Sequence, residues 1–314
     1  MQQFEGGQSN PTYRIDTGER KLVLRRKPPG TLLPSAHAVE REFRIMRALA
    51  GTHVPVPNCL ALCEDPEVIG SAFFVMEYVE GRILHDPTLA ALPRAAREPV
   101  YAEMNRVIAK LHSLDPNALG VGDYGRAGGY IQRQVQRWTN QYRASQTEDI
   151  PAMERLIEWL PLHIPPGDET RIVHGDFRLD NLIFDSREPR ILAVLDWELS
   201  TLGHPLADFA YHCLCWYRSP DTKQGLQGLD FEALGVPKVE KYLAEYCARL
   251  GRPALAAHQW EYYVVFNMFR LVGILQGIAK RAIQGNASSV QAEQMGRGAR
   301  PLAEQAWRRV EALG

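Results

Sequence analysis

Hydrophobic and polar positions divide the chain into a first part with strand-like alternation and a longer part with helical spacing. Residues 11–16 and 21–27 are short alternating segments on either side of the turn 17–20. Gly18 can take the tight position of that turn, so the arrangement predicts a β-hairpin. Residues 71–81 form a further apolar segment that ends on glycine, which predicts another strand.

One segment in this first part has helical spacing instead. Residues 35–51 predict a helix with Ser35 at its start, because serine commonly caps helix N-termini. Its apolar residues recur at intervals of three and four positions: Val39, Phe43, Met46 and Leu49.

From about residue 90 the apolar positions take the spacing of long helices. Residues 97–114 and 129–145 predict amphipathic helices. Strand signals return briefly between residues 171 and 196, and the rest of the chain is helical almost to its end. The pattern predicts an α+β fold with a small β-rich lobe, 1–80, and a larger α-rich lobe, 81–314. A ligand is expected in the cleft between two such lobes.

Composition and charge exclude several classes of protein. The chain is 45% hydrophobic and 23% charged, with a net charge of −1, so neither nucleic acid nor an anionic membrane is an expected partner. Residues 1–20 lack the apolar core of a signal peptide. The apolar segment 262–278 is interrupted by Asn267, Arg270 and Gln276, which predicts a buried helix rather than a membrane span.

The five cysteines do not form a complete disulfide framework, because their number is odd. Neither close pair, Cys59 with Cys63 or Cys213 with Cys215, has the His and Cys neighbours of a zinc site. We therefore expect reduced thiols in a cytoplasmic protein.

The candidate chemistry lies in "VHGDFRLDNLIF", residues 173–184, and "ILAVLDWE", residues 191–198. Asp176 and Asn181 bracket one tight loop between two strands, and Asp196 ends a third strand beside it. Phosphoryl transfer needs one carboxylate to take the proton of the acceptor hydroxyl, which suits Asp176. It also needs oxygen ligands for Mg²⁺, which suits Asn181 and Asp196.

Each of these residues alone is as well explained by an ordinary structural role. Aspartate is a common residue in loops and turns, which would explain Asp176, Asp180 and Asp185. It is also a common helix cap, which would explain Asp196. The joint pattern of "HGDxxxxN" and an apolar strand that leads into "DWE" favours the functional interpretation.

This segment resembles the catalytic loop and metal-binding segment of the aminoglycoside-phosphotransferase and choline-kinase family, which is related to the protein kinases. The resemblance implies a protein-kinase-like two-lobe fold. It also implies an enzyme that uses ATP and Mg²⁺. It implies that Asp176 is the catalytic base and that Asn181 and Asp196 are Mg²⁺ ligands. His174 corresponds to an orienting residue, and Asp208, in "GHPLADFAY", to an acid that holds the catalytic loop.

The same resemblance assigns a phosphate-covering turn to "GGQSNPTY", residues 6–13. Gly6 and Gly7 would let backbone amides approach phosphate oxygens, and Ser9 and Asn10 belong to the same turn. Because Gly, Ser and Asn are also ordinary turn residues, the assignment depends on the downstream motif.

A cation for the phosphates is expected on the strand that follows. Arg25 stands where the pattern of this family places lysine, and Glu42 is its expected partner on the helix. Arginine keeps the charge and binds phosphate through two donors. The register leaves Lys27 as an alternative cation and Glu40 as an alternative partner.

Residues 77–82 resemble the hinge between the lobes, where backbone groups from Glu77 to Val79 would contact adenine. The sequence contains no "GxGxxG", "HRD" or "APE" motif, which argues against a protein kinase with a regulated activation loop. Glu198 is either an acid that assists a second metal or a solvent-facing residue.

Two segments, 23–49 and 267–289, resemble the kinase-like domain found fused to acyl-CoA dehydrogenases. No dehydrogenase sequence follows here, so a stand-alone form is expected. That subgroup implies a hydroxylated acyl acceptor, a hydroxyacyl-CoA or a hydroxy acid. Arg270, Lys280 and Arg281 could meet its carboxylate or phosphates, unless their helix serves packing alone.

The function predicted is thus an ATP- and Mg²⁺-dependent transfer of phosphate to a hydroxyl group of a small molecule. The alternatives are an aminoglycoside- or choline-type kinase, a protein kinase, and a nucleotide-binding pseudokinase that acts as a regulatory scaffold. The sequence leaves open the acceptor, the choice between ATP and GTP, and the oligomeric state.

Overall fold

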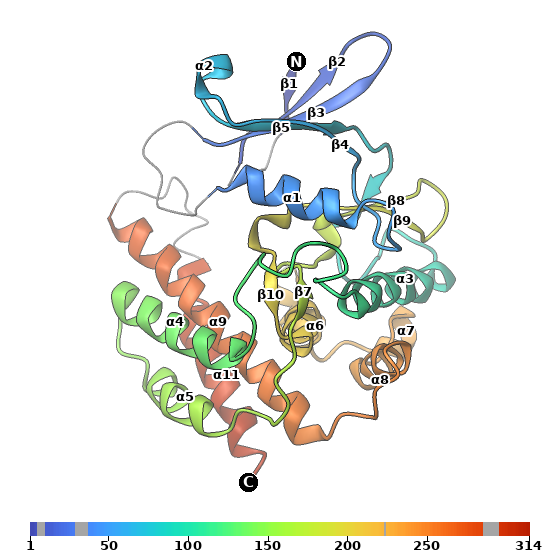
Figure 1. Ribbon diagram of the computed structural model, residues 1–314. Helices are drawn as coiled ribbons and strands as arrows, with labels where there is room; N and C mark the ends of the chain where they lie inside the picture. Colours follow the sequence, from blue (N-terminus) through green and yellow to red (C-terminus); the bar gives the residue numbers. More distant parts are fainter. Residues whose placement is uncertain (5–9, 29–36, 223, 285–294) are drawn as a thin grey trace.

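The chain forms a sheet covered by one helix, followed by a larger body of helices around short strands (Figure 1). The computed structural model describes residues 1–4, 10–28, 37–222, 224–284 and 295–314. The β-rich part comes first in the chain, as the predicted α+β arrangement requires. The exact division into 1–80 and 81–314 remains a prediction.

Five antiparallel strands form the N-terminal sheet, in the order β1–β2–β3–β5–β4. They are β1 (Gln2–Gln3), β2 (Thr12–Asp16), β3 (Lys21–Arg26), β4 (Cys59–Cys63) and β5 (Phe73–Glu77). The predicted hairpin is present as β2 and β3, and Gly18 in its turn has a φ of 84°, which favours glycine. β3 lies between β2 and β5, so Arg25 belongs to an interior strand of the sheet.

Helix α1 (Val39–Leu49) packs against β4 and β5. Its buried side chains recur at helical spacing: Val39, Glu42, Ile45, Met46 and Leu49. Glu42 thus occupies a position on the face that packs against the sheet. The helix begins after Ala38 rather than near Ser35, which lies outside the described residues. A short helix, α2 (Pro66–Ile69), joins β4 to β5.

The second part of the chain is mostly helical, and its longest helix is α9 (Ala257–Ile283). The others are α3 (Arg94–Ser113), α4 (Tyr130–Ser145), α5 (Pro151–Leu162), α6 (Pro205–His212), α7 (Phe231–Leu234), α8 (Val239–Arg249) and α11 (Ala299–Glu311). α9 packs against α4, α6 and α11. It is long and apolar enough to cross a membrane, but 72% of its apolar window is buried in the protein, as predicted for a buried helix.

The chain also forms two small sheets. One has the order β6 (Arg82–Ile83), β8 (Leu182–Phe184), β9 (Ile191–Val194), and the other pairs β7 (Arg171–Val173) with β10 (Thr201–Gly203). The described residues also include the 3₁₀ turns η1 (Leu179–Asn181), η2 (Trp197–Leu199), η3 (Cys213–Tyr217) and η4 (Pro220–Thr222). All five cysteines are free in the structure.

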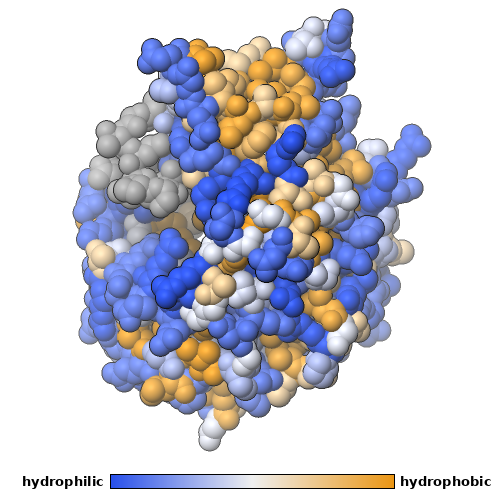
Figure 2. All heavy atoms as spheres, in the orientation of Figure 1, coloured by the Kyte–Doolittle hydropathy of each residue, from blue (hydrophilic) through white to orange (hydrophobic). Residues whose placement is uncertain are grey.

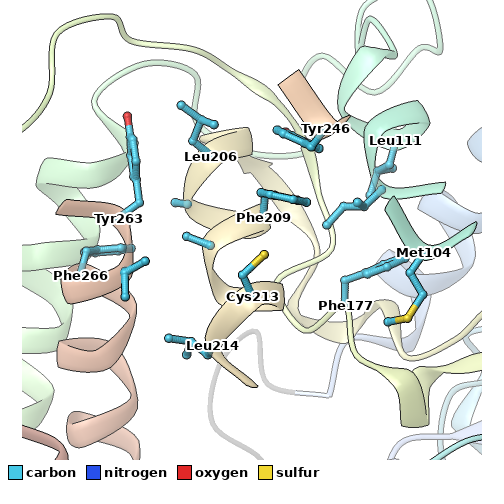
Figure 3. Packing of buried hydrophobic residues seen from close by; sticks show 14 of the residues in the cluster. Met104, Leu111, Phe177, Leu206, Phe209, Cys213, Leu214, Tyr246, Tyr263 and Phe266 are labelled. Atoms are coloured by element: carbon cyan, nitrogen blue, oxygen red, sulfur yellow. The ribbon is translucent and has the colours of Figure 1, made fainter. Parts of the chain in front are cut away.

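The core around α6 fixes the position of that helix (Figure 3). On one side Phe209 stacks on Tyr246, with ring centroids 3.8 Å apart and planes at 12°. On the other side α9 contributes Tyr263 and Phe266, which are both buried. Asp208 is the neighbour of Phe209 in α6 and is also buried, so its carboxylate is held by a well-packed helix.

On the face shown in Figure 2, hydrophilic residues cover most of the helical part, and hydrophobic residues gather over the N-terminal sheet.

Gly81 stands where the chain passes from the N-terminal sheet to β6. A Cβ atom at this position would overlap the carbonyl oxygen of Phe184 and would lie 2.5 Å from Cγ2 of Ile183. The segment between the lobes therefore depends on a residue without a side chain.

Gly81→Ala should reduce the free energy of unfolding by about 1–3 kcal/mol, because the added methyl group forces β6 and β8 apart. Urea unfolding measures this. Gly277→Ala is the matched control, because its Cβ would meet only Nη1 of Arg281, at 3.7 Å. Alanine also favours helix, so this control should keep or gain up to about 1 kcal/mol. Equal stability of the two variants would contradict the steric argument.

Candidate active site

The loop that follows β7 brings Asp176 and Asn181 together. Gly175 has a φ of 84°, and a Cβ there would lie 2.7 Å from the carbonyl oxygen of Leu199, so the turn requires glycine. Nδ2 of Asn181 donates to the carboxylate of Asp176 (3.1 Å) and to its carbonyl oxygen (2.9 Å). The loop therefore closes on itself, and its two polar side chains meet at one point.

Asp208 holds the start of this loop through the backbone. Its Oδ2 accepts from the N–H of His174 and its Oδ1 from the N–H of Gly175, both at 2.8 Å. The ring of His112 also lies against it, with Nε2 3.1 Å from Oδ2. Burial opposes ionisation of Asp208, yet the hydrogen bonds from His112 and from the His174 backbone hold its pKa below the ordinary value.

His174 connects the loop to the segment that carries Asp196. The ring is fully buried; its Nδ1 lies 3.2 Å from the N–H of Asp176 and its Nε2 lies 2.9 Å from the carbonyl oxygen of Leu195. A neutral imidazole with its proton on Nε2 satisfies both contacts. His174 therefore lies where an orienting residue would, next to both candidate carboxylates.

Asp196 follows β9 in a left-handed conformation, with φ 63° and ψ 60°. The predicted strand ends earlier, at Val194, and Asp196 stands two residues beyond it. Such a conformation is uncommon outside glycine and is found most often at functional sites. Its Oδ1 accepts from Nη2 of Arg25 at 2.6 Å, which links the second part of the chain to the N-terminal sheet.

Arg25 is surrounded by acids. Its Nε lies 2.9 Å from Oε2 of Glu42, and its Nη2 lies 2.6 Å from Asp196 and 3.7 Å from Glu198. We call these four side chains the Arg25 cluster. One cation faces three carboxylates, so the cluster has an excess of negative charge. Nδ2 of Asn10, which is buried, donates to Oε1 of Glu42 at 2.7 Å and keeps that carboxylate in place.

The surroundings of Glu42 oppose its ionisation. Burial raises the pKa of Glu42 to about 7, and the negative charges of Asp196 and Glu198 add to this, while Arg25 opposes it. A further positive charge at the cluster would reverse the effect. The cluster is therefore suited to receive a cation.

The structure distinguishes the alternatives that the sequence left open around Arg25. Nζ of Lys27 forms a separate ion pair with Glu40, at 2.9 Å, near the surface. Arg25, rather than Lys27, reaches Asp196, and Glu42, rather than Glu40, is its partner on α1.

Two of the other nucleotide-binding candidates, Glu77 and Val79, lie outside the cluster. Gly6, Gly7 and Ser9 are outside the described residues. Glu77 ends β5 opposite Leu22 of β3, and Val79 follows two residues later, at the start of the segment between the lobes.

Sequence reasoning missed two side chains that contact the predicted ones. Arg178 bridges two carboxylates, with Nε 2.8 Å from Asp176 and Nη2 3.2 Å from Asp180. It lies inside the "HGDFRLDN" motif, so its position between two acids was a usable signal. His112 comes from α3 and meets Asp208 only through folding, so no local pattern marks it.

A cavity of about 260 Å³ lies beside Asp176 and against α9. Arg178, Tyr211 and Arg270 are among its polar lining residues. Nη2 of Arg270 donates to the carbonyl oxygen of Gly175 at 3.1 Å, so this arginine also supports the catalytic loop. A molecule in the cavity would lie next to the carboxylate of Asp176.

The donor set fits Mg²⁺ held together with phosphates. Asn181 and Asp196 offer only oxygen atoms as ligands, which Mg²⁺ prefers, and the Arg25 cluster supplies the negative surroundings. Within the part of the chain that the structure describes, no three His, Cys, Asp or Glu side chains are grouped to hold a metal. An ion here would therefore take its remaining ligands from phosphates and water.

The sequence matches the phosphotransferase enzyme family over residues 1–260. It is 53% identical over 307 residues to acyl-CoA dehydrogenase family member 10 of Mus musculus, covering 97% of this chain and 28% of that protein. It is 42% identical over 303 residues to acyl-CoA dehydrogenase family member 11 of Homo sapiens, covering 96% and 39%. The chain thus spans well under half the length of these relatives. The predicted resemblance to the phosphotransferase family and to the kinase-like region of acyl-CoA dehydrogenase family members is confirmed.

Solved structures confirm the protein-kinase-like two-lobe fold. A crystal structure of a candidate aminoglycoside phosphotransferase of Ralstonia eutropha has a TM-score of 0.92 at 53% identity, covering 99% of this chain and 92% of that chain. Aminoglycoside 2'-phosphotransferase-IIIa in its GDP complex has a TM-score of 0.65 at 15% identity, covering 98% and 92%. A mutant of APH(4)-Ia with ADP and hygromycin B has 0.64 at 16%, with the same coverage.

Glu42→Gln should flatten the dependence of stability on pH between about 4.5 and 7. Because the pKa of Glu42 rises from 4.5 to about 7 on folding, the folded chain holds a proton that the unfolded chain releases. The contribution of this group to stability is full below pH 4.5 and declines as the pH rises through 7. Glutamine carries no such proton, and urea unfolding at a series of pH values measures the difference.

Glu40→Gln is the matched control on the same helix, because this side chain is 35% exposed. We expect it to keep the slope of the parent protein. An equally steep decline in Glu42→Gln and in the parent would contradict the role of Glu42.

Proposed function

The chain belongs to the phosphotransferase enzyme family, and we propose that it transfers the γ-phosphoryl group of ATP to a hydroxyl group of a small molecule. The observation that supports this most is the contact of Arg25 with Asp196 beside the loop that carries Asp176 and Asn181. It joins a cation for phosphates, oxygen ligands for a metal and a carboxylate base in one place.

In this proposal the nucleotide lies between the N-terminal sheet and the catalytic loop. Arg25 would exchange Asp196 for phosphate oxygens while Glu42 keeps hold of Nε. The predicted turn with Gly6, Gly7 and Ser9 would cover the phosphates. Two structures that share the fold contain GDP or ADP, which supports a nucleotide in the cleft.

Asn181 and Asp196 would hold Mg²⁺ through their side-chain oxygens. When bound, the ion neutralises the charge of the phosphate oxygens. Release of Arg25 from Asp196 frees that carboxylate for the metal. The excess negative charge of the Arg25 cluster supports this exchange.

Asp176 would act on the acceptor. As the acceptor oxygen bonds to the γ-phosphorus, its proton passes to the carboxylate of Asp176, and the bond from phosphorus to the bridging oxygen of ADP breaks. Asn181 and Arg178 hold the carboxylate oxygens at 3.1 and 2.8 Å, so the base is oriented before the acceptor arrives.

The acceptor proposed is a hydroxylated acyl compound, either a hydroxyacyl-CoA or a hydroxy acid. The relatives are named as acyl-CoA dehydrogenase family members, which supports an acyl substrate. The cavity beside Asp176 is bordered by arginines and by apolar residues of α9, which suits such a molecule better than a polycationic aminoglycoside.

Asp176→Asn should reduce phosphoryl transfer by at least about 100-fold, because general base catalysis contributes that much. ADP release is measured against a panel of hydroxyacyl-CoAs, hydroxy acids, choline, aminoglycosides, homoserine and sugars. Asp65→Asn is the matched control, because asparagine caps α2 as well as aspartate does. Equal turnover in Asp176→Asn and in the parent would remove Asp176 from its role.

The same panel, applied to the parent protein, also separates the proposal from the pseudokinase alternative. A parent protein that binds Mg²⁺ and ATP but releases no ADP with any member of the panel would favour the pseudokinase.

Asp196→Asn should weaken Mg²⁺-dependent nucleotide binding, because it removes the charged ligand. The readout is the rise in melting temperature caused by Mg²⁺ and ATP, which reflects binding to the folded state. We expect this rise in the parent and in Asp230→Asn, where asparagine replaces the cap of α7. A full rise in Asp196→Asn would show that the metal is held elsewhere.

A further inference from the structure

Two arginines in the cavity beside Asp176 converge on one neutral side chain. Nη1 of Arg218 donates to Oε1 of Gln224 at 3.0 Å, and Nη1 of Arg178 donates to the same oxygen at 3.3 Å. Arg178 also pairs with Asp176 and Asp180, so its charge is compensated. Among the described residues, the side chain of Arg218 contacts the uncharged oxygen of Gln224, which also accepts from Arg178.

Arg218 has no counterion among the described residues. No carboxylate of the described residues forms an ion pair with it, although the side chain is partly buried. Burial lowers the pKa of Arg218, and the positive charge of Arg178 adds to this. A buried cation is costly unless an anion accompanies it, and a neutral amide oxygen offsets only part of that cost.

A third guanidinium borders the same cavity. Arg270 packs over the ring of Tyr211, 4.4 Å from its centroid, and lines the cavity with it. Its Nε is buried and has no hydrogen-bond partner among the described residues. The carboxylates that line the cavity, Asp176 and Asp180, both already pair with Arg178. The cavity thus has unused positive charge.

One wall of the cavity is apolar. Side chains from successive turns of α9 line it, together with one from η3 and one from the start of the last described segment. They are Leu271, Ile274, Leu275 and Ile278 of α9, with Leu214 and Met295. A hydrocarbon chain placed along α9 would be removed from water there.

We propose that Arg218, with Arg178, binds an anionic oxygen group of the acceptor, a carboxylate or a phosphate. The oxygen of Gln224 marks where that group enters, between the two guanidinium groups. The hydrocarbon part of the acceptor packs along α9. This inference depends on the proposed function only for what happens to the hydroxyl group next.

The geometry also places the anionic group near the reacting hydroxyl. A single guanidinium, that of Arg178, contacts Asp176 through Nε and Gln224 through Nη1. Asp176 and the proposed anion site therefore lie next to different nitrogen atoms of the same guanidinium group. Arg218 is then a specificity-determining residue, which selects acceptors that carry negative charge and rejects polycations.

Direct binding tests this without ATP, by isothermal titration calorimetry. The probes are 3-hydroxydecanoate, its uncharged methyl ester and 3-hydroxydecanoyl-CoA, and the proteins are the parent, Arg218→Met and Arg218→Lys. Arg190→Met is the matched control, because this arginine is 62% exposed in a surface turn. Arg218→Met should weaken binding of an anionic probe about 10- to 100-fold, since hydrogen bonds to charged groups contribute that much.

Binding of the methyl ester should change less than about 3-fold in Arg218→Met, and Arg190→Met should resemble the parent with every probe. A loss confined to 3-hydroxydecanoate identifies a carboxylate, and a loss confined to the CoA derivative identifies its phosphates. Equal losses for the acid and the ester, or unchanged binding of both anionic probes, would overturn the proposal.

Arg218→Lys keeps the positive charge and should retain the preference for the anionic probe. If Arg218→Met does not fold, the parent protein itself decides, because added salt should weaken binding of the anion but not of the ester. Absence of that difference would overturn the proposal. Absence of phosphoryl transfer with binding intact would overturn the proposed function instead.

Discussion

Three carboxylates from two parts of the chain converge on Arg25, and the arrangement of the lobes depends on this cluster. Glu42 comes from α1, while Asp196 and Glu198 come from the segment after β9. A charge removed from water requires partners at short range, so β3, α1 and η2 must be aligned for the cluster to form. Helix α1 is fixed further by Arg41, which donates to the carbonyl oxygen of Tyr124 at 2.8 Å.

The loop that carries Asp176 and Asn181 is held by a second set of buried polar groups. Asp208 binds the backbone of His174 and Gly175, and His174 in turn contacts Asp176 and Leu195. Each of these contacts satisfies a group that would otherwise be buried without a partner. Helix α6, whose packing is seen in Figures 1 and 3, is therefore linked to the backbone of Asp176 by hydrogen bonds through Asp208 and His174. The position of Asp176 thus depends on the core of the helical part.

The sequence predicted the elements that depend on the local spacing of residues. It did not predict the contacts that form between segments far apart in the chain. The β2–β3 hairpin, α1 and the loop with Asp176 and Asn181 follow from turn residues and periodicity. The short strands β4 and β10 were not predicted, because three to five residues give little periodicity. The contact of Arg218 with Gln224 and Arg178 depends on how η3 meets the catalytic loop, so no pattern along the chain marks it.

The most direct test of the account is ³¹P NMR of the reaction with Mg²⁺, ATP and the acceptor that gives the highest turnover. If Asp176 serves a small-molecule acceptor, the γ-phosphate signal of ATP is replaced by that of a phosphomonoester, formed in an amount equal to ADP. Inorganic phosphate as the only phosphorus product besides ADP would mean that water, not a hydroxyl of the acceptor, takes the phosphoryl group. That result would contradict the central claim that Asp176 serves a small-molecule acceptor.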